Sequence, residues 1–151
     1  MRWLTAVVTI LLLALTAPLG AAGTCTQEHY PVGSVRKIVI ACTADAANGS
    51  FPATVLTTKF EGRLLAIVTN PGSTAPTDDY DIAITDAEGL DVLKGVGANR
   101  DTANTESAAI LYSSTSVNPV VDESDTLTLA ITNNSNNSAT VVIVLYYALG
   151  G

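Results

Sequence analysis

The stretch "YDIAITDAEG", residues 80–89, contains the signals of a strand and of a turn. Apolar residues at 80, 82 and 84 alternate with Asp81, Ala83 and Thr85, and this period is typical of a β-strand that buries one face. The polar residues that follow end in Gly89 and lead to the apolar segment 90–93. We expect a hairpin turn in which Gly89 has a positive φ and Asp86 binds local backbone amides.

Similar segments occur on both sides of this stretch. They are rich in β-branched residues or alternate in polarity, and they cover residues 35–42, 60–69, 126–132 and 140–147. Clusters of Gly, Pro, Ser, Asn and Asp separate them, and beyond residue 20 no window keeps a helical apolar stripe. The sequence therefore predicts an all-β domain, an antiparallel β-sandwich of jelly-roll type with about seven strands.

The first twenty-two residues have the pattern of a targeting segment. Arg2 is followed by an almost wholly apolar run from Trp3 to Thr16, and Pro18 then precedes small residues. This pattern predicts a signal helix cleaved after Ala22. An uncleaved membrane anchor is the alternative, because the run nearly reaches the roughly 20 apolar residues that span a bilayer. Residues 23–151 are expected to form a single domain.

The charge of the chain argues against a polyanionic partner. The formal net charge is −7, and loss of Arg2 with the leader leaves six basic against fourteen acidic residues, or −8. Nucleic-acid binding depends on clustered Lys and Arg that replace counterions. We therefore expect no nucleic-acid partner.

Two cysteines, Cys25 and Cys42, remain after the leader. An export signal implies an oxidising compartment, where we expect them to form a disulfide. The bond would tie the N-terminal segment to the first predicted strand. Two unpaired thiols are the alternative if the protein is not exported.

Acidic side chains cluster around the predicted turn. The six are Asp78, Asp79, Asp81, Asp86, Glu88 and Asp91. Loop carboxylates can bind calcium, but an EF-hand pattern is missing. We therefore interpret the cluster as turn chemistry with solvated side chains, and Asp81 is expected on the solvent face.

Other candidates for chemistry are few. His29, the single histidine, is expected on the surface of an N-terminal tail, where it makes neither a zinc site nor a catalytic triad. The loop Gly95–Arg100 lacks the Gly-Lys-Ser/Thr ending of a phosphate-binding loop, and Arg100 is expected to pair with Asp101 or Glu106. We predict no catalytic residue, no cofactor and no metal site, and hence no enzyme.

The C-terminal apolar run predicts a contact between subunits. Residues 141–147, Val-Val-Ile-Val-Leu-Tyr-Tyr, place apolar side chains on both faces of one strand, whereas a sandwich strand needs only its inward face covered. The outward face is Val142, Val144 and Tyr146 in one phase of the strand, or Val141, Ile143, Leu145 and Tyr147 in the other. The residues expected at the interface are Val142, Val144, Leu145 and Tyr146. A homo-oligomer follows from this expectation.

Two stretches, "VRKIVIACTADAANG" (35–49) and "GRLLAIVTNPGSTAPTDDYDIAITDAEGLDVLKGVGANRDTANTE" (62–106), resemble small structural proteins of tailed bacteriophages. The similarity covers about residues 35 to 147, and its central block is the specific part. The resemblance implies a non-enzymatic, β-rich virion component at the head or the head–tail region. It implies no catalytic or binding residues. The leader departs from this pattern, since phage head proteins ordinarily carry none, and it puts the location in doubt.

Two functions remain open at this point. The first is a structural protein that decorates or cements an assembly, with other virion or surface subunits as partners. The second is an exported periplasmic or cell-surface β-sandwich that binds glycans or another ligand, and its weakness is the small number of aromatic residues. The location is the virion, or the periplasm or medium if the leader is used. Contact with a membrane is expected only through residues 1–22, if they are uncleaved.

Overall fold

The computed structural model describes residues 22–57, 59, 61–112 and 118–150. The predicted signal helix lies outside these residues except for Ala22. The described part of the chain contains nine β-strands and no helix, which confirms the all-β prediction. The strands are β1 (Thr24–Tyr30), β2 (Val35–Thr43), β3 (Thr54–Val55), β4 (Gly62–Pro71), β5 (Asp81–Thr85), β6 (Glu106–Ala109), β7 (Val120–Val121), β8 (Thr128–Thr132) and β9 (Thr140–Ala148).

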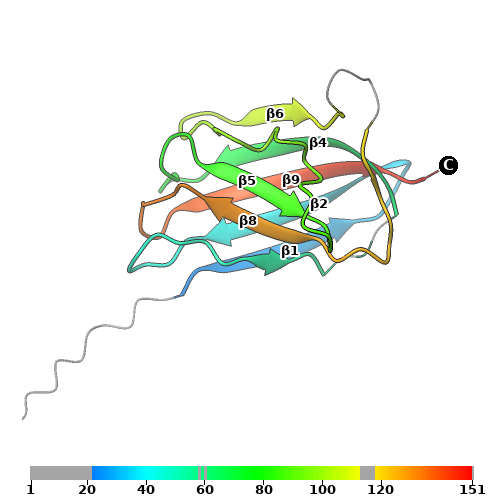
Figure 1. Ribbon diagram of the computed structural model, residues 1–151. Helices are drawn as coiled ribbons and strands as arrows, with labels where there is room; N and C mark the ends of the chain where they lie inside the picture. Colours follow the sequence, from blue (N-terminus) through cyan, green and yellow to red (C-terminus); the bar gives the residue numbers. More distant parts are fainter. Residues whose placement is uncertain (1–21, 58, 60, 113–117, 151) are drawn as a thin grey trace, which may run out of the picture.

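The strands form two sheets. Sheet A has the order β1-β2-β9-β4-β6, with β7 also paired to β4, and sheet B has the order β3-β8-β5. All pairings are antiparallel. In Figure 1 the strands β5 and β8 of sheet B lie in front of β4, β9 and β2 of sheet A. The predicted antiparallel sandwich is therefore confirmed.

The connections give the sandwich a jelly-roll order. From β2 to β5, and again from β7 to β9, each strand lies in the opposite sheet from the strand before it. Sheet A thereby contains the sequence of neighbours β2-β9-β4-β7, and sheet B contains β3-β8-β5. Such alternation is the Greek-key arrangement of a jelly roll.

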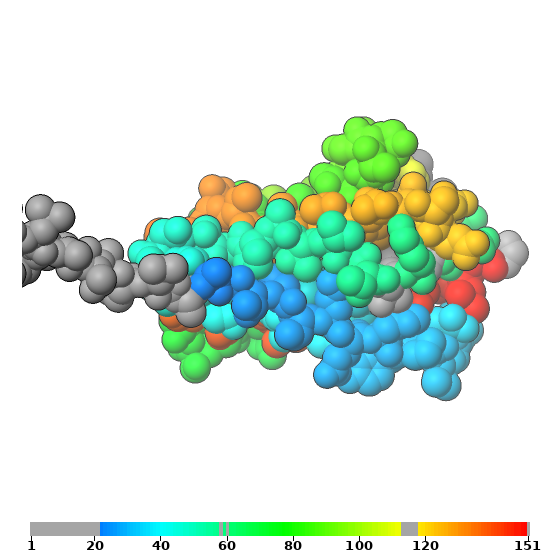
Figure 2. All heavy atoms as spheres, turned by 90° about the horizontal axis from the view of Figure 1, so that it is seen from below, coloured from blue at the N-terminus to red at the C-terminus, as the bar shows by residue number. Residues whose placement is uncertain are grey.

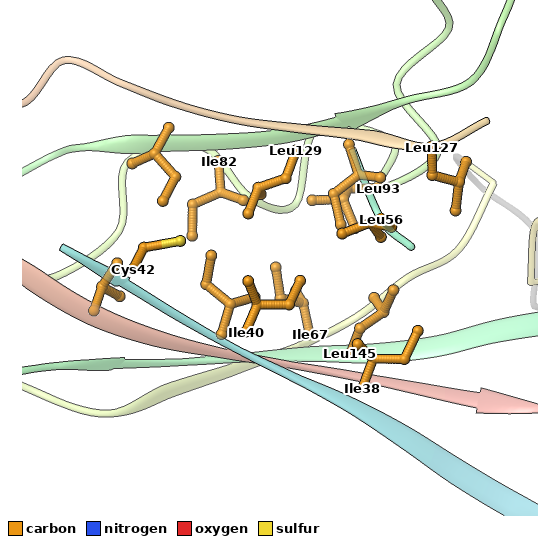
Figure 3. Packing of buried hydrophobic residues seen from close by; sticks show 14 of the residues in the cluster. Ile38, Ile40, Cys42, Leu56, Ile67, Ile82, Leu93, Leu127, Leu129 and Leu145 are labelled. Carbon is orange, nitrogen blue, oxygen red and sulfur yellow. The ribbon is translucent and has the colours of Figure 1, made fainter. Parts of the chain in front are cut away.

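A single apolar core fills the space between the sheets. Ile38, Ile40 and Leu145 extend from sheet A toward Ile82 and Leu129 of sheet B (Figure 3), and these five side chains are at most 6% exposed. Residues from the connecting segments, among them Leu56, Leu93 and Leu127, complete the same cluster. Burial of each such side chain stabilises the fold by about 1.5–3 kcal/mol.

The outer edge of β5 is covered by the segment 91–100. Arg100 and Tyr80 form an isolated antiparallel β-bridge. The backbone amide of Ile82 donates to the Gly97 carbonyl at 2.8 Å, and the backbone amide of Val92 donates to the Ile84 carbonyl at 2.8 Å. The apolar segment 90–93, expected as the second arm of a hairpin, makes only the bridge from Asp91 to Thr85 and continues in turns. It covers a sheet edge because Val92 and Leu93 enter the core.

The opposite side of the sandwich is closed at β1. This strand was not predicted, because its residues are mostly polar and carry no apolar period. The side-chain Nε2 atom of Gln27 donates to the backbone carbonyl of Val55 at 2.8 Å. The backbone amide of Thr57 donates to the side-chain Oε1 atom of Gln27 at 2.9 Å. Seen from below (Figure 2), the blue β1 lies beside the cyan-to-green segment that contains β3. One side chain therefore links the edges of the two sheets.

Candidate assembly surface

Strand β9 is the middle strand of sheet A and shows two distinct faces. Val141, Ile143 and Tyr147 are at most 1% exposed and point into the core, whereas Val142 and Val144 are half-buried and point outward. Tyr146 shares the outward face. The expectation of a contact at Leu145 needs correction: this residue is fully buried in the core, because it lies in register with the inward Ile38.

A row of valines crosses the centre of the outer face. Val144 pairs with Val39 of β2 on one side and with Val68 of β4 on the other. Val39 and Val144 are the middle pair of the nine-residue ladder between β2 and β9. Glu28 of β1 and Ser107 of β6 end the row at its two sides. The centre of the face is thus aliphatic and only half-buried.

The row of Tyr146 has larger side chains on one side and small ones on the other. Lys37 and Tyr30 lie on the β1 side of Tyr146, whereas Ala66 and Ala109 lie on its β6 side. The Lys37 ammonium lies 4.6 Å from the centroid of the Tyr30 ring. In the next row, Ala41 and Asn70 flank Val142.

Few charged side chains lie on this face, and one of them, Lys37, lies on β2 directly beside Tyr146 of the central strand. The outward strand residues of sheet A include three charged side chains, Glu28, Lys37 and Arg63. The Glu28 carboxylate accepts a hydrogen bond from the Tyr30 hydroxyl at 2.7 Å, and this bond is the main cause of the raised pKa of Tyr30. No acidic residue lies among the outward residues of β2, β9 or β4.

Sheet B provides an internal comparison. Its outward residues on β8 and β5 are threonines, alanines and Asp81. They can remain in water at little cost, whereas exposed aliphatic surface on a sheet commonly marks an interaction site. We call the outward residues of sheet A around Val144 the valine face, and it comprises Val35, Lys37, Val39, Ala41, Arg63, Ala66, Val68, Asn70, Val142, Val144, Tyr146 and Ala148, with Glu28, Tyr30, Ser107 and Ala109 at its two sides.

Sequence analysis identified β9 but missed the partners of Val144. The segments "KIVIA" (37–41) and "LLAIV" (64–68) also carry apolar residues at consecutive positions. Like residues 141–147, each of these segments places apolar side chains on both faces of a strand, which is a signal for outward apolar residues such as Val39 and Val68. The pairing of these three strands could not be inferred, because β2, β4 and β9 are not consecutive.

The acidic cluster forms turns, as predicted. Gly89 has a φ of 83°, its amide donates to the Asp86 carbonyl at 3.1 Å, and the Leu90 amide donates to the Asp86 carboxylate at 2.8 Å. Asp91 accepts from the amides of Leu93 and Gly95. Asp81 is only half-exposed, because its carboxylate accepts from the Asn99 amide at 2.8 Å. The described residues contain no group of three or more His, Cys, Asp or Glu side chains that could hold a metal ion.

Both cysteines and the histidine lie on β1 or its neighbour. Cys25 and Cys42 face each other in the β1–β2 ladder and form the predicted disulfide. His29 is not on a tail: it is half-buried in β1, and its ring stacks on Tyr147 with the centroids 6.0 Å apart. Its Nε2 atom is 2.5 Å from the Tyr147 hydroxyl. This contact is part of the inner packing of sheet A.

A buried polar cluster lies beside the core. Arg100 is 5% exposed and forms an ion pair with Glu106, one of the two partners expected for it, at 3.2 Å. Beside them the Tyr80 hydroxyl is buried without a hydrogen-bond partner among the described residues. Burial raises the pKa of Tyr80, and nearby Thr69 and Arg100 oppose this shift more weakly.

No protein-family model, no curated protein sequence and no solved structure matches the chain. The described part of the molecule forms no pocket. Within that part there is also no helix with the length and apolar character needed to cross a membrane. The valine face is the candidate functional site that the outward residues of sheet A provide.

Proposed function

We propose that this protein is a non-enzymatic structural component that acts through contacts between subunits. The observation that carries the proposal is the row Val39, Val144 and Val68, which leaves the centre of sheet A aliphatic on its outward side. A sandwich satisfies its own core with the inward faces alone. An outward aliphatic row supports an additional contact, and this role requires neither a cofactor nor nucleic acid.

The sequence resemblance suggests where such a component acts. Similarity to small structural proteins of tailed bacteriophages supports a place in the virion, as a head decoration or a part of the head–tail region. Jelly-roll domains are frequent in viral capsids. The fold also hosts unrelated functions, so it supports the proposal only together with the valine face.

The test is the composition of purified particles. Quantitative mass spectrometry of particles from a culture that produces the protein should find it at a fixed ratio to the other particle proteins, and the ratio should persist through a second density gradient. Recovery in periplasm or medium only, with none in particles, would overturn the proposal.

A second candidate is an exported ligand-binding module of the periplasm or cell surface. The disulfide between Cys25 and Cys42 favours it, because such bonds persist in oxidising compartments. Jelly-roll domains also include lectins, and Tyr30, 45% exposed, is an accessible aromatic ring. Retention of the protein on a glycan array, lost in Tyr30→Ala, would support this candidate.

A further inference from the structure

We infer that the valine face binds the valine face of a second copy, with the two Val144 side chains meeting at the two-fold axis. This inference rests on the proposed function and names its partner. Val144 lies in the middle residue pair of the β2–β9 ladder and on the third of the five strands in the main order of sheet A. It is therefore the centre of the face, where contacts contribute most to binding.

The area of the face fits a stable dimer. The strands β1, β2, β9, β4 and β6 contain 7, 9, 9, 10 and 4 residues. At ~3.3 Å per residue and ~4.8 Å between strands they cover a flat area on the order of 600 Å². Side chains corrugate this plane and increase its accessible area. A standard interface buries about 800 Å² on each partner.

The face is complementary to itself. A two-fold axis along β9 exchanges the position of β2 with that of β4, and the position of β1 with that of β6, while each row meets the same row of the other copy. In the rows of Val144 and Tyr146, large residues of β1 and β2 then meet small residues of β4 and β6, whereas on β9 itself Tyr146 lies against Tyr146 of the second copy. Lys37 faces Ala66 of the second copy, Tyr30 faces Ala109, and Glu28 faces Ser107, while Val39 meets Val68. Such a self-complementary surface is what a two-fold dimer requires.

A second copy fits better than a lipid surface. Helices that bind membrane interfaces insert long apolar side chains such as Trp, Phe and Leu. The valine face carries short Val side chains in its central row and Ala side chains beside that row. Flat sheets of this kind pack about 10 Å apart in sandwiches.

The local charge also permits association. The chain as a whole has a formal net charge of −7. On the valine face Lys37 and Arg63 outnumber Glu28, which gives a local charge of +1. Contact through this face therefore avoids the acidic loops around residues 78–91, which would repel one another.

The first experiment compares oligomeric state. Sedimentation velocity of the purified protein over a concentration series should show a dimer. Val144→Asp should weaken dimerisation roughly 100-fold, because it buries an unpaired charge at the centre of the contact. Ala83→Asp, on the outward side of β5 in sheet B, is the matched control and should dimerise like the parent. Unchanged circular dichroism would show that both variants are folded.

The second experiment tests the predicted pairing. Ala66→Lys should separate the copies by placing a lysine against Lys37 of the partner. Adding Lys37→Ala exchanges the large and small residues and should restore the dimer. In addition, Val144→Cys should give a disulfide-linked dimer under mild oxidation, and Ala83→Cys should not.

The outcomes separate this inference from the proposed function. A parent that stays monomeric, or equal effects of Val144→Asp and Ala83→Asp, would overturn the inference. Binding to vesicles of anionic and neutral lipid that Val144→Asp abolishes, without a dimer, would do the same and identify a lipid surface. Incorporation of a monomeric protein into particles would leave the proposed function standing. A dimer that is absent from particles would contradict the proposed function but would support the inferred contact between valine faces.

Discussion

Arg100 donates two hydrogen bonds to the hydroxyl oxygen of Thr69, from Nε at 3.1 Å and from Nη2 at 3.0 Å. The contact fixes the end of the segment 91–100 to the C-terminal part of β4. Both residues are buried. The segment that covers the edge of sheet B is thus held by sheet A.

We predict that Arg100→Lys lowers the free energy of unfolding by about 2–4 kcal/mol. A lysine cannot donate to Thr69, to the Val96 carbonyl and to Glu106 in the fixed geometry of the guanidinium. Chemical denaturation measures the change. Arg63→Lys, at an exposed position, is the control and should change stability by less than about 0.5 kcal/mol. Equal stability of the two variants would contradict the assigned role of Arg100.

Tyr80→Phe should leave the protein as stable as the parent or stabilise it by up to about 1 kcal/mol, since the hydroxyl removed is buried without a partner. The pKa of Tyr80 is raised above its ordinary value of 10.0. The folded state therefore holds this proton more tightly than the unfolded state. Stability should fall as the pH rises above about 10 and through the folded pKa, and less so in Tyr80→Phe. Denaturation curves at pH 8 to 11 would show this, and a clear loss of stability in the variant at pH 8 would reveal a partner.

Replacing both cysteines by alanine, Cys25→Ala with Cys42→Ala, should lower the free energy of unfolding by about 3 kcal/mol, because the bond restricts the unfolded chain over a sequence separation of 17 residues. A reducing agent should weaken the parent by a similar amount and leave the double variant unchanged. Thiol labelling provides the second measurement. Free thiols in oxidised parent protein would contradict the bond.

Gly89 and Gly97 should respond differently to alanine. Gly89→Ala should cost about 1 kcal/mol, because φ is 83° but no atom lies within 4 Å of the added carbon. Gly97→Ala should cost more, about 2–4 kcal/mol, because the added carbon would lie 2.1 Å from the Ile82 carbonyl oxygen. Thermal denaturation would rank the two.

The carboxylates of the turn are expected to tolerate neutral replacements. Asp86→Asn keeps an oxygen that can accept from the Leu90 amide, and Glu88 is exposed. Each of Asp86→Asn and Glu88→Gln should therefore change stability by less than about 0.5 kcal/mol. A rise in melting temperature with calcium that Asp86→Asn abolishes would instead indicate a cation site.

The strands with regular patterns were the predictable part of the fold. Residues 80–85 and 126–132 carry their period in their own side chains, and Gly89 marks its turn in the same way. Strand β1 was missed because its inward side chains, Cys25, Gln27 and His29, are stabilised by partners far along the chain. Such partners leave no local signal.

The same limit applies to the candidate site. That residues 141–147 turn an apolar face outward could be predicted from one strand. The row with Val39 and Val68 could not, because it depends on a strand order that local sequence does not encode. Leu145 shows the ambiguity of a continuous apolar run, since both faces of β9 look alike until the register is known.

The central position of β9 has a consequence for how the molecule is made. Residues 140–148 follow all the other strands in the chain, yet they lie between β2 and β4 and pair with both. Among the described strands only β1 and β2 are consecutive and paired. During synthesis the growing chain can therefore form one hairpin, and sheet A closes only after residue 148 has left the ribosome. Pairings between distant segments make folding slow, and until β9 arrives the edges of β2 and β4 stay open to other chains. We therefore expect the nascent chain to be open to aggregation until β9 has been synthesised.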